Sequence, residues 1–137
     1  MTDISKFIKK WHNRVLEDCG SYVSKEFHSF QLAFINQLRK IAKNNGAEVV
    51  NPCYGHYDIS CFIKKNGKFV YLHYDNTLNS GRNVVCLMGF VSGCHAPMLI
   101  RTVKGEKDYS GGENNFCQFE NCEELINNLL NDMPNGN

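Results

Sequence analysis

The chain has 137 residues, of which 42% are hydrophobic and 21% charged, and its formal net charge is +1 at pH 7. This length is typical of one folded domain, so residues 1–137 are expected to form a single unit that buries its own core. A net charge so close to zero argues against strong direct binding of nucleic acid, and no apolar run is long enough to span a membrane.

The first ten residues lack the apolar segment of a signal peptide, so a cytoplasmic location is expected. The sequence also contains seven cysteines. Because the number is odd and the cytoplasm is reducing, a disulfide framework is not expected. These residues are therefore interpreted as buried thiols, metal ligands or a nucleophile.

Two amphipathic helices are expected at the start of the chain. The first begins near Asp3 and ends at Gly20, and the second begins at Ser24 and ends at Asn44-Asn45-Gly46. The apolar positions of the first helix are Ile4, Phe7, Ile8, Trp11 and Val15, with Leu16 beside them. Those of the second helix are Phe27, Phe30, Phe34, Leu38 and Ile41.

The clearest strand pair in the sequence is a β-hairpin over residues 55–75. Its turn is Asn66-Gly67, the strongest two-residue type I′ signal, which fixes the register of the two strands. One face is apolar throughout and is expected to face the core: Ile59, Cys61, Ile63, Val70, Leu72 and Tyr74. The other face is polar at one end and aromatic at the other: His56, Asp58, Ser60, Phe62, Tyr71, His73 and Asp75.

Four more segments carry strand-forming patterns, namely residues 47–50, 84–91, 97–103 and 116–119. The segment 84–91 is apolar on both faces, which is typical of a central strand. Asn121 and Glu124 form a capping box for a last helix that extends to Met133. The expected fold is α+β: an antiparallel four- to five-stranded meander with two N-terminal helices and one C-terminal helix packed on one face.

A structural zinc site is predicted at one end of this meander. The loop after the strand at 84–91 and the end of the last strand are expected to meet there, beside the hairpin tip. The predicted ligands are Cys94, His95, Cys117 and Cys122. Thiolate and imidazole are ligands that suit zinc, and a closed set of four is structural. A second possible set lies at the other end: Cys53, His56, His73 and Cys86.

A catalytic interpretation rests on polar residues that share one face of the hairpin, namely Asp58, Ser60, His73 and Asp75. Facing carboxylates beside a histidine can hold a divalent metal or transfer protons, as in a metal-dependent nuclease-like or nucleic-acid-binding module. A restriction-type nuclease places an acid-x-lysine motif on the second strand. The corresponding positions here are Tyr71, Leu72 and His73, so a non-enzymatic role is favoured.

Several motifs together resemble those of small proteins and "large polyvalent protein-associated" domains from phages, plasmids and conjugative elements of Gram-positive bacteria. The similarity spans residues 55–133, and residues 74–96 depart from the pattern. The motifs are Gly55-His56-Tyr57-Asp58-Ile59-Ser60, Asn66-Gly67-Lys68 with Tyr71, Leu99-Ile100-Arg101-Thr102, Asp108-Tyr109-Ser110-Gly111-Gly112 and Asn114-Asn115.

Such mobile-element families include antagonists of host defence. The resemblance therefore implies a non-enzymatic anti-CRISPR protein that binds a type II CRISPR effector nuclease of the host and blocks DNA loading or cleavage. Some inhibitors of this kind are small metalloproteins, in agreement with the predicted zinc. The loop 104–115 is expected to be a shaped turn in which Arg101, Asp108 and Tyr109 hold each other. The expected partner-binding residues are Phe62, Tyr71, Arg101, Asp108 and Tyr109.

Overall fold

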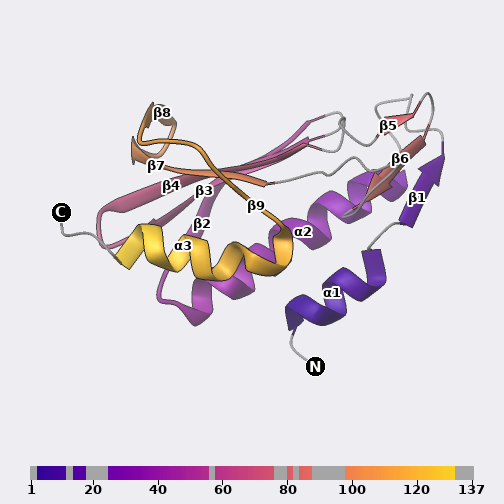
Figure 1. Ribbon diagram of the computed structural model, residues 1–137, viewed down its shortest axis with the longest axis horizontal. Helices are drawn as coiled ribbons and strands as arrows, with labels where there is room; N and C mark the ends of the chain where they lie inside the picture. The colour runs from indigo at the N-terminus through magenta and orange to yellow at the C-terminus, as the bar shows by residue number, and fades with distance from the viewer. Residues whose placement is uncertain are drawn as a thin grey trace.

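A computed structural model describes residues 3–11, 14–17, 25–55, 58–75, 80–81, 84–87 and 98–131. The fold is α+β, as the sequence predicts: a six-stranded antiparallel sheet packs against three helices. Figure 1 shows the sheet as one layer and the helices as the layer beneath it. No helix in the described part of the chain is both long and apolar enough to cross a membrane.

The helices are α1 (Asp3–Trp11), α2 (Lys25–Asn44) and α3 (Cys122–Asn131), with a short 3-10 turn, η2 (Phe119–Asn121), before α3. The main sheet has the order β2-β3-β4-β7-β8, and β9 also pairs with β7. Its strands are β2 (Glu48–Tyr54), β3 (Asp58–Lys65), β4 (Lys68–Asp75), β7 (Met98–Gly105), β8 (Asp108–Gly111) and β9 (Asn115–Cys117). A second, three-stranded sheet contains β1 (Arg14–Glu17), β5 (Ser80–Gly81) and β6 (Val84–Leu87).

The predicted hairpin is confirmed in its turn, its register and its buried face. Asn66 and Gly67 both have positive φ, at 50° and 79°, as a type I′ turn requires. The strands pair from Lys65 opposite Lys68 to Asp58 opposite Asp75. All six residues of the predicted core face are buried: Ile59, Cys61, Ile63, Val70, Leu72 and Tyr74.

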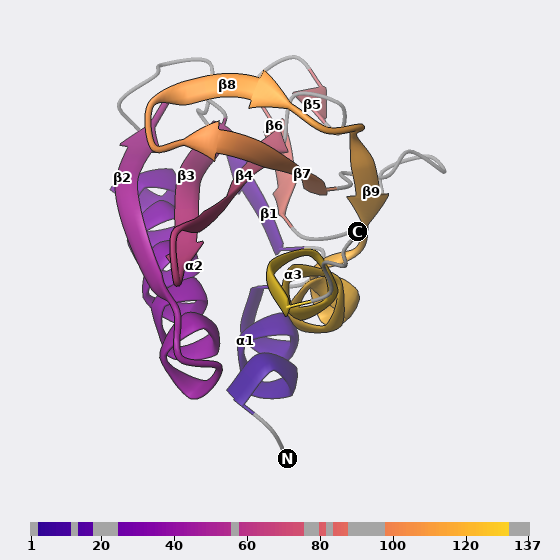
Figure 2. The same cartoon turned by 90° about the vertical axis from the view of Figure 1, so that its left-hand side faces the viewer.

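Helix α2 covers the inner face of this hairpin with the predicted aromatic stripe. The ring of Phe34 stacks on Tyr74 with centroids 5.0 Å apart and meets Phe119 at 5.1 Å. Asn45, just after α2, donates a 2.8 Å hydrogen bond to Glu123 and accepts one of 2.8 Å from Asn127, so α2 is tied to α3. Figure 2 shows the helices on one side of the sheet and β8 on the other.

The first helix is shorter than predicted. It ends at Trp11, and Val15 and Leu16 lie in β1, which pairs with β6. The helical spacing of these residues is also compatible with a strand. Pairing with β6 satisfies the backbone groups of β1, and such tertiary contacts override a weak local helical preference. The predicted extension of the first helix to Gly20 is therefore wrong.

The predicted meander would place the strand at 84–91 beside the hairpin, and this is wrong for residues 84–87. Strand β6 belongs to the second sheet, and β4 pairs directly with β7 from Tyr74 opposite Met98 to Phe69 opposite Val103. An apolar run shows that a strand is buried but does not show which neighbour it pairs with.

Strand β2 continues past the predicted end at Val50 as far as Tyr54. Pro52 is accommodated because β2 is an edge strand and because the register shifts between Val50 and Cys53. Asn51 has a φ of 51°, which is consistent with this bulge.

Candidate functional site

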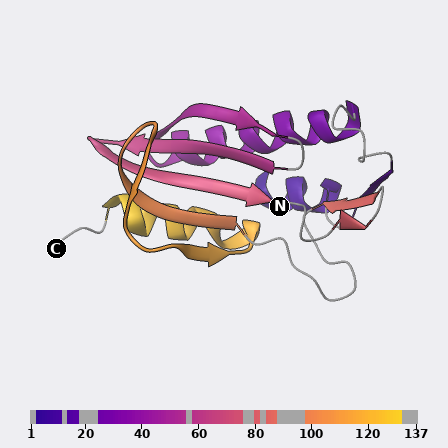
Figure 3. The ribbon, with the colours of Figure 1, turned by 90° about the horizontal axis from the view of Figure 1, so that it is seen from above.

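The outer face of the main sheet, which points away from the helices, carries the polar and aromatic residues of the hairpin. Asp58, Ser60 and Phe62 project from β3, and Tyr71 and His73 project from β4, because side chains alternate along a strand. The register with β7 places Arg101 opposite Tyr71 on the same face. Figure 3 shows this face from above, with no helix of the described chain in front of it.

A segment called here the β8 arm, residues 105–112, folds back over part of the outer face. Lys107 makes the turn with a φ of 67°. Asp108 accepts hydrogen bonds from the backbone N–H of Ser110 at 3.0 Å and from its hydroxyl at 2.6 Å. These bonds lower the pKa of the Asp108 carboxyl and fix the turn.

The two glycines of the Asp-Tyr-Ser-Gly-Gly motif bring the arm close to β7. A Cβ atom on Gly111 would overlap the backbone carbonyl oxygen of Thr102, so only glycine fits without a shift. The N–H of Gly112 donates to the same oxygen at 2.8 Å. The Asp-Tyr-Ser-Gly-Gly motif therefore holds the arm against β7.

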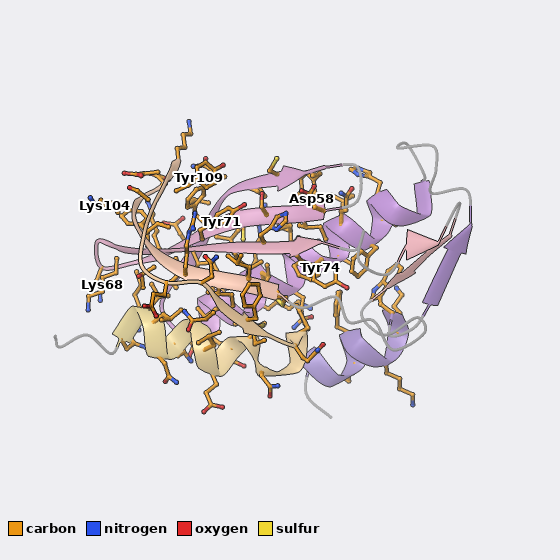
Figure 4. All side chains as sticks on the ribbon, turned by 45° about the horizontal axis from the view of Figure 1, so that its top comes forward. Asp58, Lys68, Tyr71, Tyr74, Lys104 and Tyr109 are labelled. Atoms are coloured by element: carbon orange, nitrogen blue, oxygen red, sulfur yellow. The ribbon has the colours of Figure 1, made fainter. Side chains whose placement is uncertain are left out.

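The arm completes an aromatic cluster, defined here as Phe62, Tyr71 and Tyr109. The Tyr109 ring lies 5.4 Å from Phe62 and 4.9 Å from Tyr71, and Phe62 lies 5.3 Å from Tyr71. Phe62 is only 3% exposed although it projects from the outer face, whereas Tyr109 is 54% exposed. Figure 4 shows Tyr109 from the arm above Tyr71 of the sheet. The cluster thus presents a wide tyrosine surface on a buried support.

Arg101 lies against this cluster with unused hydrogen-bonding capacity. Its guanidinium carbon is 5.8 Å from the centroid of the Tyr71 ring, and Nη1 donates to Asn114 at 3.2 Å. The Nε atom is buried without a hydrogen-bond partner, and no described carboxylate is within ion-pair distance. The expected contact between Arg101 and Asp108 is not observed, because Asp108 accepts its hydrogen bonds from Ser110.

At the polar end of the outer face, Asp58 and His73 form a pair. Asp58 Oδ2 and His73 Nε2 are 3.0 Å apart, and the His73 ring is nearly parallel to that of Tyr71 at 6.3 Å. Burial raises the pKa of the Tyr71 phenol above its ordinary value, and a hydrogen bond with Ser60 acts in the opposite direction. The polar pair and the aromatic cluster are therefore parts of one surface. The side chain of Asp75 lies outside the described residues.

Gln31 of α2, which the sequence does not single out, supports the Asp58 backbone from beneath. Its amide donates to the carbonyl oxygens of Gly55 at 2.8 Å and Asp58 at 2.9 Å. A Cβ atom on Gly55 would overlap the Asp58 carboxylate, so glycine leaves room for it. The sequence does contain one signal for this role of Gln31. It is a polar residue next to Phe30 on a buried helical stripe, and a buried polar side chain needs a hydrogen-bond partner.

The predicted zinc ligands fall partly outside the described residues. Cys94 and His95 are not described, Cys117 lies half-buried in β9, and Cys122 is buried at the start of α3. Burial raises the pKa of Cys117 to about 11 and raises that of Cys122 further, so both thiols are protonated at neutral pH in the absence of metal. Within the described part, no three His, Cys, Asp or Glu residues gather to hold a metal. Zinc stays a prediction.

The second possible metal set lies only partly within the described residues. Cys53 is exposed in β2 opposite Ser60, and His73 is paired with Asp58. His56 lies outside the described residues, as does the side chain of Cys86. The strand that carries Cys86 pairs with β1 and β5 rather than with the hairpin, and this set stays a prediction.

No family model, curated protein or solved structure matches this chain. The resemblance to mobile-element proteins is thus a prediction from the motifs alone.

Proposed function

We propose that this chain is a non-enzymatic binding protein that docks on another protein through the outer face of its sheet. The observation that supports this most is the aromatic cluster, whose Tyr109 ring is exposed above a buried Phe62. Tyrosine and arginine are enriched among the residues that dominate binding energy at protein interfaces. A cluster already packed on a sheet loses little side-chain entropy on binding.

The distribution of charge favours a protein partner over a nucleic acid. The Lys64 ammonium lies 3.6 Å from Glu48, and the His73 imidazole lies 3.0 Å from Asp58, so two of the basic side chains on this face stand beside carboxylates. Binding of single-stranded nucleic acid requires a continuous basic groove beside the stacking rings. Arg101 has no carboxylate neighbour among the described residues, which suits an acidic side chain of the partner.

The resemblance to mobile-element proteins supplies the candidate partner, a type II CRISPR effector nuclease of the host. An inhibitor of DNA loading needs no chemistry of its own, because a rigid surface that occupies the DNA-binding channel is sufficient. The outer face offers such a surface, since strands hold it from below and the Gly111–Thr102 contact holds the β8 arm.

The proposal is tested by measuring DNA cleavage by a purified, guide-loaded effector from such a host. The wild-type chain is expected to inhibit cleavage, and Tyr109→Ala or Arg101→Ala should raise the half-inhibitory concentration by about tenfold or more, as loss of a hot-spot residue does. Leu32→Ala is the matched control, because Leu32 is a 43% exposed residue on α2, away from the outer face. Absence of inhibition by the wild type, or equal inhibition by Tyr109→Ala, would contradict the proposal.

The second candidate is a metal-dependent nuclease-like or nucleic-acid-binding module, which the Asp58–His73 pair favours. A carboxylate 3.0 Å from an imidazole is an arrangement that can transfer a proton or contribute two metal ligands. If this interpretation is correct, Asp58→Asn and His73→Ala should each abolish a Mg²⁺- or Mn²⁺-dependent cleavage of DNA or RNA. Cleavage that persists in both variants would exclude the pair as its source.

A further inference from the structure

A groove in the helical layer of the molecule combines positive charge with an apolar floor. The outer face lies on the opposite side of the sheet (Figure 2). The groove lies between α1 and α2 and encloses about 350 Å³. The residues that line it include Lys6, Phe7, Lys10, Trp11, Gln37 and Lys40. This volume is in the range of pockets that take small molecules.

Three ammonium groups border the groove. Lys6 and Lys10 are one helical turn apart on α1, so they project from the same side of that helix, and Lys40 faces them from α2. No acidic residue lines the groove in the described part of the chain. Like charges gathered without a counter-charge repel each other, and a bound anion would relieve that repulsion.

Gln37 supplies a polar group to the wall of the groove. Its side chain is only 6% exposed, but its amide is not among the buried groups that lack a partner in the described residues. An amide offers two donors and an acceptor, so a ligand in the groove can pair with it.

The floor of the groove is aromatic. Phe7 and Trp11 are both buried, and the Lys10 ammonium lies 5.2 Å from the centroid of the Trp11 ring. An apolar floor favours an organic group over a bare inorganic ion, since a ring or chain can contact it.

We propose that this groove binds a small organic phosphate. The phosphate group lies among the ammonium groups of Lys6, Lys10 and Lys40, and the organic part lies against Trp11 within reach of the Gln37 amide. A phosphate monoester carries close to two negative charges at neutral pH and several acceptor oxygens, which matches a set of lysines better than a single carboxylate does. The site is separate from the outer face, so it stands or fails independently of the proposed protein partner.

The test uses intrinsic fluorescence, because Trp11 is the only tryptophan in the chain. Titration with adenosine 5′-monophosphate is expected to change the emission saturably and to raise the melting temperature. Inorganic phosphate should bind at least about tenfold more weakly, and adenosine should bind more weakly still, because each lacks one of the two recognised parts.

Two variants test the lining residues. The double variant Lys6→Gln/Lys40→Gln should raise the dissociation constant at least about tenfold, and Gln37→Met should raise it several-fold. Lys43→Gln is the matched control, because Lys43 is exposed on α2 but does not line the groove, and its affinity should be unchanged. The proposal is overturned by the absence of saturation at millimolar nucleotide, by equal affinity for adenosine or inorganic phosphate, or by equal affinity in the Lys6→Gln/Lys40→Gln variant.

Discussion

Replacement of Phe34 by alanine is expected to reduce the free energy of unfolding by about 3–5 kcal/mol, the range for large buried aromatic residues. Phe34 is completely buried, and its ring contacts rings from α1, α2, β4 and η2. The contacting rings are Phe7, Phe30, Phe119 and Tyr74. The cavity left by the substitution would lie where the helical layer meets the sheet, which is why a large loss is expected.

Urea unfolding of Phe34→Ala measures this loss in the free energy of unfolding, and Leu32→Ala serves as the control in the same helix. Leu32 lies two positions earlier and is 43% exposed, so its replacement should cost less than about 1 kcal/mol. If both variants lost the same free energy of unfolding, the face of α2 that carries Phe34 would not be the face that packs on the sheet.

Replacement of Gly111 by alanine is expected to release the β8 arm and with it the candidate binding surface. The new methyl group would overlap the Thr102 carbonyl oxygen, which is backbone and cannot rotate away. The arm would then have to shift from β7, at a cost of about 1–3 kcal/mol for an overpacked contact. Tyr109 would leave Phe62 and Tyr71, so inhibition or partner binding should weaken as much as in Tyr109→Ala.

Gly105→Ala is the control for this prediction. Gly105 lies at the other end of the arm, and a Cβ atom there would meet nothing within 4 Å. Its replacement should leave both the melting temperature and the inhibition nearly unchanged. If Gly111→Ala inhibits as well as Gly105→Ala does, the arm is not part of the surface.

The hairpin could be predicted from the sequence because its information is local. Asn66-Gly67 fixes the turn, the turn fixes the register, and the register assigns each side chain to a face. The presence of Phe62, Tyr71 and His73 on one surface therefore follows from the sequence.

Other parts of the fold and the site depend on contacts between distant segments. The pairing of β1 with β6 joins residues about 70 positions apart, and neither pattern specifies the other. Likewise, Tyr109 meets Phe62 only because Gly111 packs on Thr102, and a glycine pair in a sequence does not show what it approaches. The groove that contains Gln37 requires the orientation of α1 on α2, which periodicity alone does not give.

Amide hydrogen exchange of the chain, alone and bound to a guide-loaded type II effector, tests most directly which face docks on the partner. Exchange reports burial and opening of each backbone segment. We predict that exchange slows in the β8 arm and in the neighbouring parts of β4 and β7, while it is unchanged in the exposed positions of α2. Protection confined to α1 and α2, with the β8 arm exchanging as fast as in the free chain, would contradict docking through the outer face.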